Sequence, residues 1–338
     1  MTRRIELAVI GAAHQHVDYV LDEVARRDDV GIAAVVEHDP ARRAALEQRS
    51  GAPGYTDVEA MLARHRIDAA SVVTEFGARA GIVATLAKRG IFAIVDKPLA
   101  VTAAGLDALE DALAGRPLVA LMLEKRFYPV TLALRGLIAD GVIGEIVTIH
   151  ATGPHKFYAA RRPDWMFDAG QYGGILADLT VHDVDLALWL VGGTRGTVSG
   201  WVSAVDAPGV GTLPGNRSFP GAGRAILTVA GGPQVAVEVD WLQPEASPRH
   251  GDYAMRITGT RGRADVLFAE DKLLVETHDT PLREWPLPPG EPPARFALDH
   301  LTKGVPLAVP TADALRATRI AILAQESAAV GGKALEWA

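Results

Sequence analysis

Three ionisable residues in two separate segments of this chain could act on a hydroxyl-bearing carbon. Lys97 follows an apolar run at 91–95. Asp178 and His182 share one face of the helix expected at 175–190. A lysine ammonium can stabilise a developing alkoxide, and a histidine can take a hydroxyl proton near neutral pH. These residues therefore predict acid–base chemistry on an alcohol, with a solvated lysine and two structural helix residues as the alternative.

Strand and helix patterns alternate through about the first 120 residues. The strand candidates are continuous apolar, β-branched runs, as expected for a parallel sheet buried on both faces. Such alternation implies right-handed crossovers and a doubly wound Rossmann sheet, which binds ligands at the carboxyl ends of its strands. The strand candidates are 5–10, 30–36, 69–74, 91–95 and 117–123, with helical patterns at 16–27, 57–65, 78–89 and 102–114.

The rest of the chain has a different pattern, and we expect two domains, at 1–122 and 123–338. Short strands with glycine-rich turns indicate a second domain of the α+β class with a large, mostly antiparallel open sheet. We expect residues 206–223 to form a mobile loop, and a last helix at 312–328 could pack back on the first domain. The later strand candidates are 145–152, 197–203, 224–230, 234–241, 253–258, 263–268 and 272–277.

A degraded glycine-rich loop follows the first strand candidate. In a dinucleotide fingerprint, G-x-G-x-x-G provides a tight turn, a close approach of the pyrophosphate and close packing of helix on strand. Here only Gly11 is kept, because Ala13 and His16 replace the other two glycines. The helix N-terminus still offers N–H groups and a positive dipole to an anion. We expect Gly11, Ala13, His14 and His16 to contact a dinucleotide, although this loop alone does not decide it.

Glu37 ends the second strand candidate, about 25 residues after the first glycine, where an acid can accept hydrogen bonds from the adenosine ribose. A carboxylate at this place repels a 2′-phosphate. Glu37 therefore favours NAD over NADP, and a solvated acid at a strand end is the alternative.

The histidines of the degraded loop also permit a metal site. Alternate residues on an extended segment point to opposite faces, so His14 and His16 could bind one ion only if the loop bends. Carboxylates or histidines of the second domain would then have to complete the shell. In the alternative, which we favour, no metal is bound, His16 packs against or caps the helix, and His14 faces the cofactor cleft.

Two motifs resemble the glucose–fructose oxidoreductase / inositol dehydrogenase / rhizopine catabolism (Gfo/Idh/MocA) family. One is Asp96-Lys97-Pro98, and the other is Gly-Gly-x-Leu-x-Asp-x-x-x-His-x-x-Asp at 173–185. The resemblance implies a Rossmann domain, a second domain whose open sheet mediates dimers or tetramers, and sugars or cyclitols as substrates. It also implies Lys97, Asp178 and His182 as the catalytic group. Further similar stretches, at 126–129, 141–146 and 257–262, extend the resemblance over essentially the whole chain.

The chain departs from this family after the third strand candidate. Where the family tends to have Thr-Pro-x-x-x-His, this chain has Thr74-Glu75-Phe76-Gly77-Ala78-Arg79. Thr74 keeps the threonine of the pattern, and we expect Thr74 and Lys97 to line the cofactor cleft.

Residues just before the catalytic helix are candidates for substrate contacts. His155, Arg162 and Trp165 lie between the first strand of the second domain and that helix. A tryptophan face stacks on a sugar ring, and an arginine binds a carboxylate or phosphate with two hydrogen bonds. We expect these residues and Arg126 to bind substrate together with the two catalytic residues of the helix. A surface loop with a packed tryptophan is the alternative.

The composition limits the possible partners. The 338 residues have a formal net charge of -7 and no lysine- or arginine-rich run, which argues against a nucleic-acid partner. The chain has no cysteine, which excludes disulfides and thiol catalysis and fits a cytoplasmic protein. The apolar run at 5–10 is too short for a signal peptide or a membrane span, so we expect no membrane partner.

We therefore expect an NAD(P)-dependent oxidoreductase that acts on a secondary hydroxyl of a sugar, cyclitol or sugar-derived acid and forms a homodimer or homotetramer. One alternative is an enzyme that cleaves or eliminates a glycoside with the help of transient oxidation by NAD. Another is a metal-dependent or non-catalytic relative that uses His14 and His16.

Overall fold

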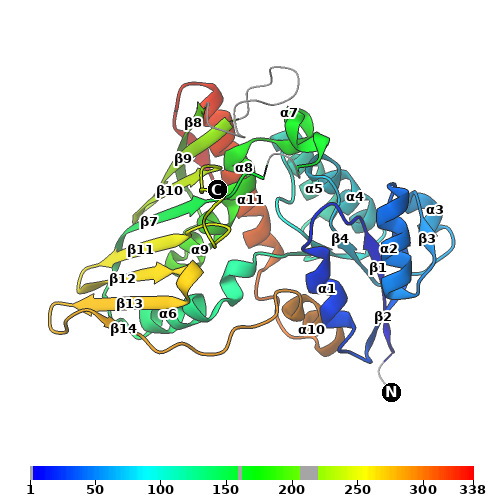
Figure 1. The fold of residues 1–338 in the computed structure, drawn as a ribbon, viewed down its shortest axis with the longest axis horizontal. Helices are drawn as coiled ribbons and strands as arrows, with labels where there is room; N and C mark the ends of the chain where they lie inside the picture. The colour runs from blue at the N-terminus through cyan, green and yellow to red at the C-terminus, as the bar shows by residue number, and fades with distance from the viewer. Residues whose placement is uncertain (1–2, 159–161, 206–219) are drawn as a thin grey trace. The chain divides into compact units, whose positions relative to one another are not determined.

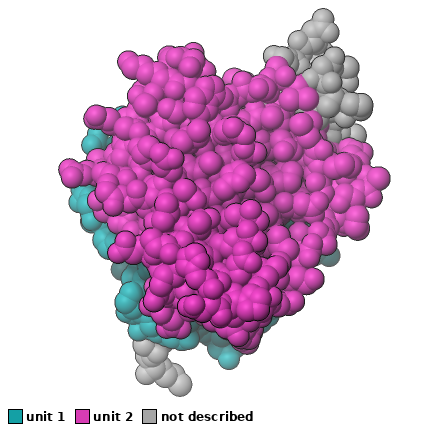
Figure 2. Space-filling view, turned by 90° about the vertical axis from the view of Figure 1, so that its left-hand side faces the viewer, with its two compact units in different colours: residues 1–123, 292–315 teal, residues 124–291, 316–338 magenta. Residues whose placement is uncertain are grey.

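The computed structural model describes residues 3–158, 162–205 and 220–338, which form two compact units. The first unit contains residues 1–123 and 292–315, and the second contains 124–291 and 316–338; Figure 2 colours them separately. The chain thus returns to the first unit after completing most of the second, a crossing that no local sequence pattern announces.

The first unit is built on a six-stranded sheet in the order β3-β2-β1-β4-β5-β6, and all its strands are parallel. Four of its strand predictions are close to the observed bounds, and the two-residue β3 is too short to leave a periodic pattern. This is the doubly wound arrangement expected from the sequence (Figure 1). The strands are β1 (Ile5–Ile10), β2 (Val30–Val36), β3 (Gly54–Tyr55), β4 (Ala69–Val72), β5 (Phe92–Val95) and β6 (Val119–Leu121).

The helices of the first unit begin at side-chain caps where the sequence supplies them. The Asp39 carboxylate accepts a hydrogen bond from the Arg42 amide at 2.8 Å, with Pro40 at the first helical position. Thr102 accepts from the Gly105 amide in the same way. The helices are α1 (Val17–Val24), α2 (Pro40–Ser50), α3 (Val58–Leu62), α4 (Phe76–Lys88), α5 (Ala103–Leu113) and α10 (Arg295–Lys303).

The second unit is built on a nine-stranded sheet in the order β14-β13-β12-β11-β7-β10-β9-β8-β15. Only the β7–β10 pair is parallel among its described strands, so the prediction of a mostly antiparallel sheet is confirmed. Residues 206–219, most of the predicted mobile loop, lie outside the described residues, and 220–223 begin β9. The strands are β7 (Ile146–Pro154), β8 (Gly196–Ala204), β9 (Pro220–Val229), β10 (Gln234–Asp240), β11 (Ala254–Gly259), β12 (Gly262–Leu267), β13 (Lys272–Thr277), β14 (Arg283–Glu284) and β15 (Leu335–Trp337).

Helices cover one face of this second sheet. Helix α6 (Pro129–Ala139) contacts β12 and β13, and α9 (Val181–Val191) contacts β7 and β10. The predicted single helix at 175–190 is wrong, because α8 (Ile175–Leu179) and α9 are separated at Thr180. The Thr180 hydroxyl donates to the Leu176 carbonyl at 2.6 Å, a side-chain bond of the kind that bends helices. Thr180 keeps right-handed helical angles, so the chain continues from one helix directly into the other.

The remaining helical elements of the second unit are short, apart from the last one. Among the described residues, no helix is both long and apolar enough to cross a membrane. These elements are η1 (Glu124–Phe127), η3 (Asp164–Phe167), α7 (Ala169–Tyr172), η4 (Phe268–Glu270) and α11 (Thr311–Ala329), which lies in the second unit from residue 316 onward.

Candidate active site

The cofactor-side residues of the first unit follow the aligned ends of four neighbouring strands. Ile10 of β1 is in register with the last residue of β2 and with Val72 of β4, and Val72 is in register with Val95 of β5. The residues that come next in each strand therefore gather at one edge of the sheet. They are Gly11, Glu37, Thr74 with the residue before it, and Asp96 with Lys97.

Gly11 is required by its backbone and by its neighbour. Its φ of 82° favours glycine, and a Cβ would lie 2.8 Å from the Thr74 amide nitrogen. The loop then stays close to β4, because the Ala13 amide donates to the Val73 carbonyl at 2.8 Å. The surviving glycine of the fingerprint thus makes the tight turn, and the replacement of the second glycine by Ala13 is accommodated.

Glu37 is a buried, hydrogen-bonded carboxylate, 3% exposed, and not a solvated acid. Its Oε2 accepts from the Ala12 amide at 2.9 Å, and its Oε1 accepts from the Asp39 amide and from Arg42, both at 3.0 Å. Burial opposes its ionisation, but Arg42 and the two amides outweigh burial and lower the pKa of Glu37. The side chain is therefore a fixed negative charge beside the loop.

A pocket of about 500 Å³ opens next to this carboxylate. Arg42 bridges Glu37 and Glu75 at 3.0 and 3.2 Å, so these two acids of the pocket lining share one arginine as their ion-pair partner. Hydroxyl groups of a ribose can donate to such carboxylates, and the acids oppose an added phosphate. The pocket lining includes Gly11, Glu37, His38, Asp57, Thr74 and Glu75.

Asp96 is the centre of a buried polar network in the first unit. Its Oδ1 lies 2.7 Å from His16 Nδ1, and its Oδ2 accepts from Arg79 Nη2 at 2.9 Å. Burial opposes ionisation of Asp96, but Arg79 and His16 hold the pKa of this carboxyl well below its usual range. His16 is the N-cap residue of α1 but makes no side-chain cap bond, so its ring serves Asp96 instead.

The loop bends so that His14 and His16 come together. Their ring centroids are 4.0 Å apart, and ligand atoms of both rings and of Asp96 lie within 4.8 Å of one another. Burial, with His16, Lys97 and Arg79 adding to it against the opposing charge of Asp96, lowers the pKa of His14 to about 3. The cations of Arg79 and Lys97 oppose a divalent ion at this place, so the geometry favours a hydrogen-bonded network over a metal centre.

Arg79 fixes the backbone that carries Lys97. Its guanidinium donates to the carbonyls of Asp96, Lys97 and Pro98, and its Nε donates to the Thr74 carbonyl at 3.0 Å. The Lys97 amide donates to Asp96 Oδ1 at 2.8 Å, and the residue is 9% exposed. In the sequence Arg79 is only a departure from a family pattern, and its contacts with this backbone become visible in the fold.

In the second unit, the hydroxyl of a tyrosine lies next to the predicted residue Asp178. Asp178 is 2% exposed in α8, and the Tyr172 hydroxyl lies beside its carboxylate and beside Trp241. Burial and the Asp178 charge raise the pKa of Tyr172 well above its ordinary value, so the phenol stays protonated and can donate. The sequence-based prediction missed Tyr172, whose only signal is its place just before the glycine pair that precedes α8.

His182 faces a second residue that sequence analysis missed. Its Nε2 lies 3.4 Å from Glu124 Oε1, and the two side chains are 8% and 10% exposed. Glu124 begins the charged run Glu124-Lys125-Arg126, which follows β6 after two apolar residues, and all three charged residues are buried. Three successive charges after an apolar strand are a signal that they have partners in the fold.

The partners of the other two charges are aspartates of α9. Lys125 Nζ donates to Asp183 at 2.7 Å, and Arg126 donates to Asp185 with two bonds of 2.7 and 2.5 Å. Burial raises the pKa of Asp183, and Lys125 acts against this rise. Arg126, predicted to bind substrate, is thus held in a buried ion pair that fixes η1 against α9, and its substrate contact stays a prediction.

Aromatic side chains connect the predicted substrate residues. The Arg162 guanidinium stacks 3.8 Å from the Trp241 ring centroid, and its Nε donates to the Phe157 carbonyl at 2.8 Å. The His155 ring lies 5.3 Å from the same indole. Burial lowers the pKa of Arg162, while Tyr172 and Asp178 act against this. His155 and Arg162 therefore join the surroundings of Asp178, and Trp165 lies half-buried in η3.

The predicted site residues are thus divided between the two units. Gly11, Ala13, His14, His16, Glu37, Thr74 and Lys97 lie in the first, and Arg126, His155, Arg162, Trp165, Asp178 and His182 in the second. The first group gathers at one edge of its sheet. In the second unit His155 and Arg162 both pack on Trp241, whereas Arg126 pairs with Asp185 and His182 lies beside Glu124. The meeting of Lys97 with Asp178 and His182 remains a prediction.

Comparisons with known proteins match both units. Residues 5–123 match the family described as oxidoreductase family, NAD-binding Rossmann fold, and residues 131–265 match the GFO/IDH/MocA C-terminal domain. The chain is 26% identical over 191 residues to inositol 2-dehydrogenase 2 of Saccharopolyspora erythraea, covering 56% of this chain and 54% of that protein. It is 27% identical over 212 residues to inositol 2-dehydrogenase of Rhizobium meliloti, covering 62% and 61%. The matches span little more than half the length of these curated relatives.

Solved structures share the fold over nearly the whole chain. Levoglucosan dehydrogenase in complex with NADH superposes with a TM-score of 0.85 at 20% identity, covering 99% of this chain and all of that one. An oxidoreductase domain protein from Kribbella flavida gives a TM-score of 0.83 at 21% identity, with complete coverage of both chains. At these identities the likeness establishes the fold.

Proposed function

Because this chain belongs to the Gfo/Idh/MocA family of NAD-binding oxidoreductases, we propose that it oxidises a secondary hydroxyl of a sugar, cyclitol or sugar-derived acid with NAD. The observation that carries the proposal is the buried Glu37 carboxylate, 2.9 Å from the amide of Ala12 in the loop after β1. It supplies a fixed acceptor for ribose hydroxyls at the edge where this fold binds nucleotides.

The residues of the first unit fit a dinucleotide in two respects. Gly11 keeps the tight turn against Thr74, and the volume of the pocket beside Glu37 lies within the range of small-molecule sites. Glu37 and Glu75 in its wall oppose a 2′-phosphate, which favours NAD over NADP, while Arg42 is already committed to both acids. His14 and His16 occupy the loop where an unsubstituted fingerprint has glycine, so the phosphates would meet imidazole as well as backbone.

The proposed chemistry divides the work among three side chains. His182 takes the proton of the hydroxyl, Lys97 stabilises the negative charge that develops on the same oxygen, and Asp178 holds a neighbouring hydroxyl with Tyr172 beside it. NAD bound at the first unit would supply the acceptor for the hydride that leaves the carbon. Arg162 and His155, both packed on Trp241, are proposed to hold the rest of the substrate.

Calorimetric titration with NAD and with NADP, in chelator and after a check for carried-over nucleotide, tests the proposal first. We expect NAD to bind more tightly than NADP and to support NADH formation from a panel of cyclitols, sugars and sugar acids. Product formation with catalytic NAD and no net NADH would instead identify the glycoside-cleaving alternative. No binding of either nucleotide by nucleotide-free protein, with stoichiometric metal at His14 and His16, would overturn the proposal.

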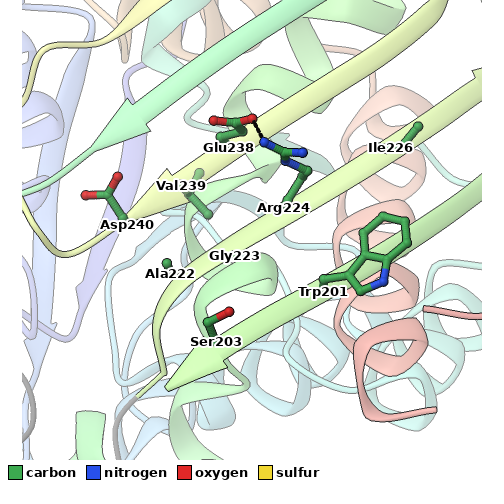
Figure 3. Close-up of a pocket in the computed structure, with 9 residues that line it drawn as sticks. All are labelled: Trp201, Ser203, Ala222, Gly223, Arg224, Ile226, Glu238, Val239 and Asp240. Atoms are coloured by element: carbon green, nitrogen blue, oxygen red, sulfur yellow. Dashed lines mark hydrogen bonds and ion pairs between the residues drawn. The ribbon is translucent and has the colours of Figure 1, made fainter. Parts of the chain in front are cut away.

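We also propose that the uncovered face of the second sheet joins copies of this chain. Trp201 and Ile226 are 43% and 36% exposed there, on β8 and β9. They flank a shallow hollow in which Arg224 pairs with Glu238 (Figure 3). Light scattering on the parent and on Trp201→Glu tests this, with a dimer or tetramer that the substitution weakens as the expected result. A monomeric parent would contradict it.

A further inference from the structure

Glu124 is a buried acid for which the proposed chemistry above has no role. It begins η1, its side chain is 10% exposed, and its Oε1 lies 3.4 Å from His182 Nε2. Within the described part of the chain, its Oε2 is buried without a hydrogen-bond partner. A carboxylate removed from water in this way needs a cation or a proton donor close by.

The neighbouring cations are committed to other acids. Lys125 pairs with Asp183 at 2.7 Å, and Arg126 pairs with Asp185. Tyr253 is kept neutral, because burial, and then the charges of Glu124 and Asp183, raise its pKa. Among the ion pairs of the described residues, Glu124 takes part in the contact with His182.

We propose that Glu124 is a positioning residue for His182. Its carboxylate accepts the Nε2–H, so the imidazole is held in the tautomer whose Nδ1 carries the lone pair. Nδ1 is then the atom that takes the hydroxyl proton, and the negative charge of Glu124 stabilises the imidazolium as it forms. The role of His182 in proton transfer rests on the proposed function. The contact between Glu124 and His182 does not depend on it.

The charge of Glu124 also predicts the direction in which it moves the titration of His182. An anion next to an imidazole favours its protonated form and raises its pKa. Asp178 and Asp183, which lie close to His182 in the chain, are unchanged in every variant below, and Lys125 balances the charge of Asp183. A change in the pKa of His182 when Glu124 is substituted therefore measures the interaction between these two side chains.

Nitrogen NMR of protein labelled in its 10 histidines tests the pair without any substrate. A His182→Gln variant identifies the His182 signals. We expect the parent to show the Nε2–H tautomer, and Glu124→Gln to lower the pKa of His182 by about one unit or more. Glu245→Gln, which removes an exposed acid, is the matched control and leaves His182 unchanged. The same tautomer population and pKa in Glu124→Gln as in the parent would overturn the proposal.

Activity gives the second readout. In the enzyme with NAD and its best polyol, Glu124→Gln should move the acidic limb of kcat/KM to lower pH and lower the plateau about 10–100-fold. Glu124→Asp, which keeps the charge, should restore part of both and covers the case in which the glutamine variant does not fold. An unmoved acidic limb in both variants would refute the positioning role. A parent without activity on any substrate would instead reject the proposed function, while the NMR result still decides the pair.

Discussion

The Asp96 carboxylate accepts a hydrogen bond from Arg79 at 2.9 Å, and the two side chains are 1% and 0% exposed. This pair joins the loop after β1 to Lys97, the lysine for which we propose a catalytic role. Asp96 holds His16 on one side, and Arg79 holds the carbonyls of Lys97 and Pro98 on the other. A change in either partner should therefore affect both stability and the placement of Lys97.

Removing the guanidinium should be strongly destabilising. Arg79→Met leaves Asp96 buried without its main cation, and breaking a buried pair in this way costs about 3–5 kcal/mol. Urea unfolding measures the loss. Arg89→Met breaks the exposed pair of Arg89 with Glu59 and is the matched control, with a change of about 1 kcal/mol or less. Equal losses in the two variants would show that the Arg79 network contributes little.

Stability should fall in acid because of two groups in the same cluster. The pKa of His14 is lowered to about 3 in the folded chain. Below about pH 6.5 the His14 side chain therefore binds a proton in the unfolded chain but stays neutral in the folded one. This proton uptake favours the unfolded chain, so the free energy of unfolding decreases progressively as the pH falls toward 3. Asp96, with its depressed pKa, adds a loss only below about pH 4, where the unfolded carboxyl becomes protonated.

Unfolding free energies at pH 7, 5.5 and 4.5 separate the two contributions. Over this range His14→Gln should show a smaller decrease than the parent, because the glutamine does not titrate. A parental slope that His14→Gln leaves unchanged would assign the loss to other groups.

The strand register explains how local sequence patterns bring the predicted cofactor residues to one edge of the sheet. Gly11, Glu37 and Lys97 each follow a continuous apolar run, and parallel strands in register place their ends at one edge. Local patterns were therefore sufficient to gather residues that are far apart in the chain. The burial of Glu37 and the bend that joins His14 to His16 were not predictable, because both depend on hydrogen bonds from the loop and from Asp96.

The second unit shows the opposite case. Seven of its nine described strands were predicted from alternation and glycine turns, and the short strands β14 and β15 were not. Glu124 and Tyr172 were also missed. Both lie in or beside short helical elements that have no periodic pattern, and both acquire a role only through contacts with α8 or α9. The break between α8 and α9 was missed for a related reason. It lies at Thr180, whose hydroxyl donates to the Leu176 carbonyl, and the pattern of apolar residues continues across it without interruption.

Glu37 should determine the choice of nucleotide. Glu37→Gln keeps the size of the side chain but removes the charge that opposes a 2′-phosphate and frees Arg42 from one of its two acids. We expect NAD to bind about 10-fold more weakly and the preference over NADP to shrink, because charge-assisted hydrogen bonds are the stronger ones. Titration calorimetry with both nucleotides measures this. Glu59→Gln is the control, because Glu59 lines the same pocket but pairs with Arg89. An equal effect of the two substitutions would show that Glu37 does not determine the nucleotide preference.

Lys97 should be needed for turnover far more than for nucleotide binding. Its ammonium is proposed to stabilise the developing oxyanion, and loss of one such donor costs about 10²–10³-fold in rate. The backbone at this position is held by Arg79 and by Asp96, and neither contact involves the lysine side chain. Lys97→Ala should therefore keep its fold and its NAD affinity while kcat collapses. Lys88→Ala, at the exposed end of α4, controls for loss of a surface lysine. If Lys97→Ala loses NAD binding in step with kcat, the lysine acts on the cofactor, and if its kcat is unchanged, Lys97 has no part in the chemistry.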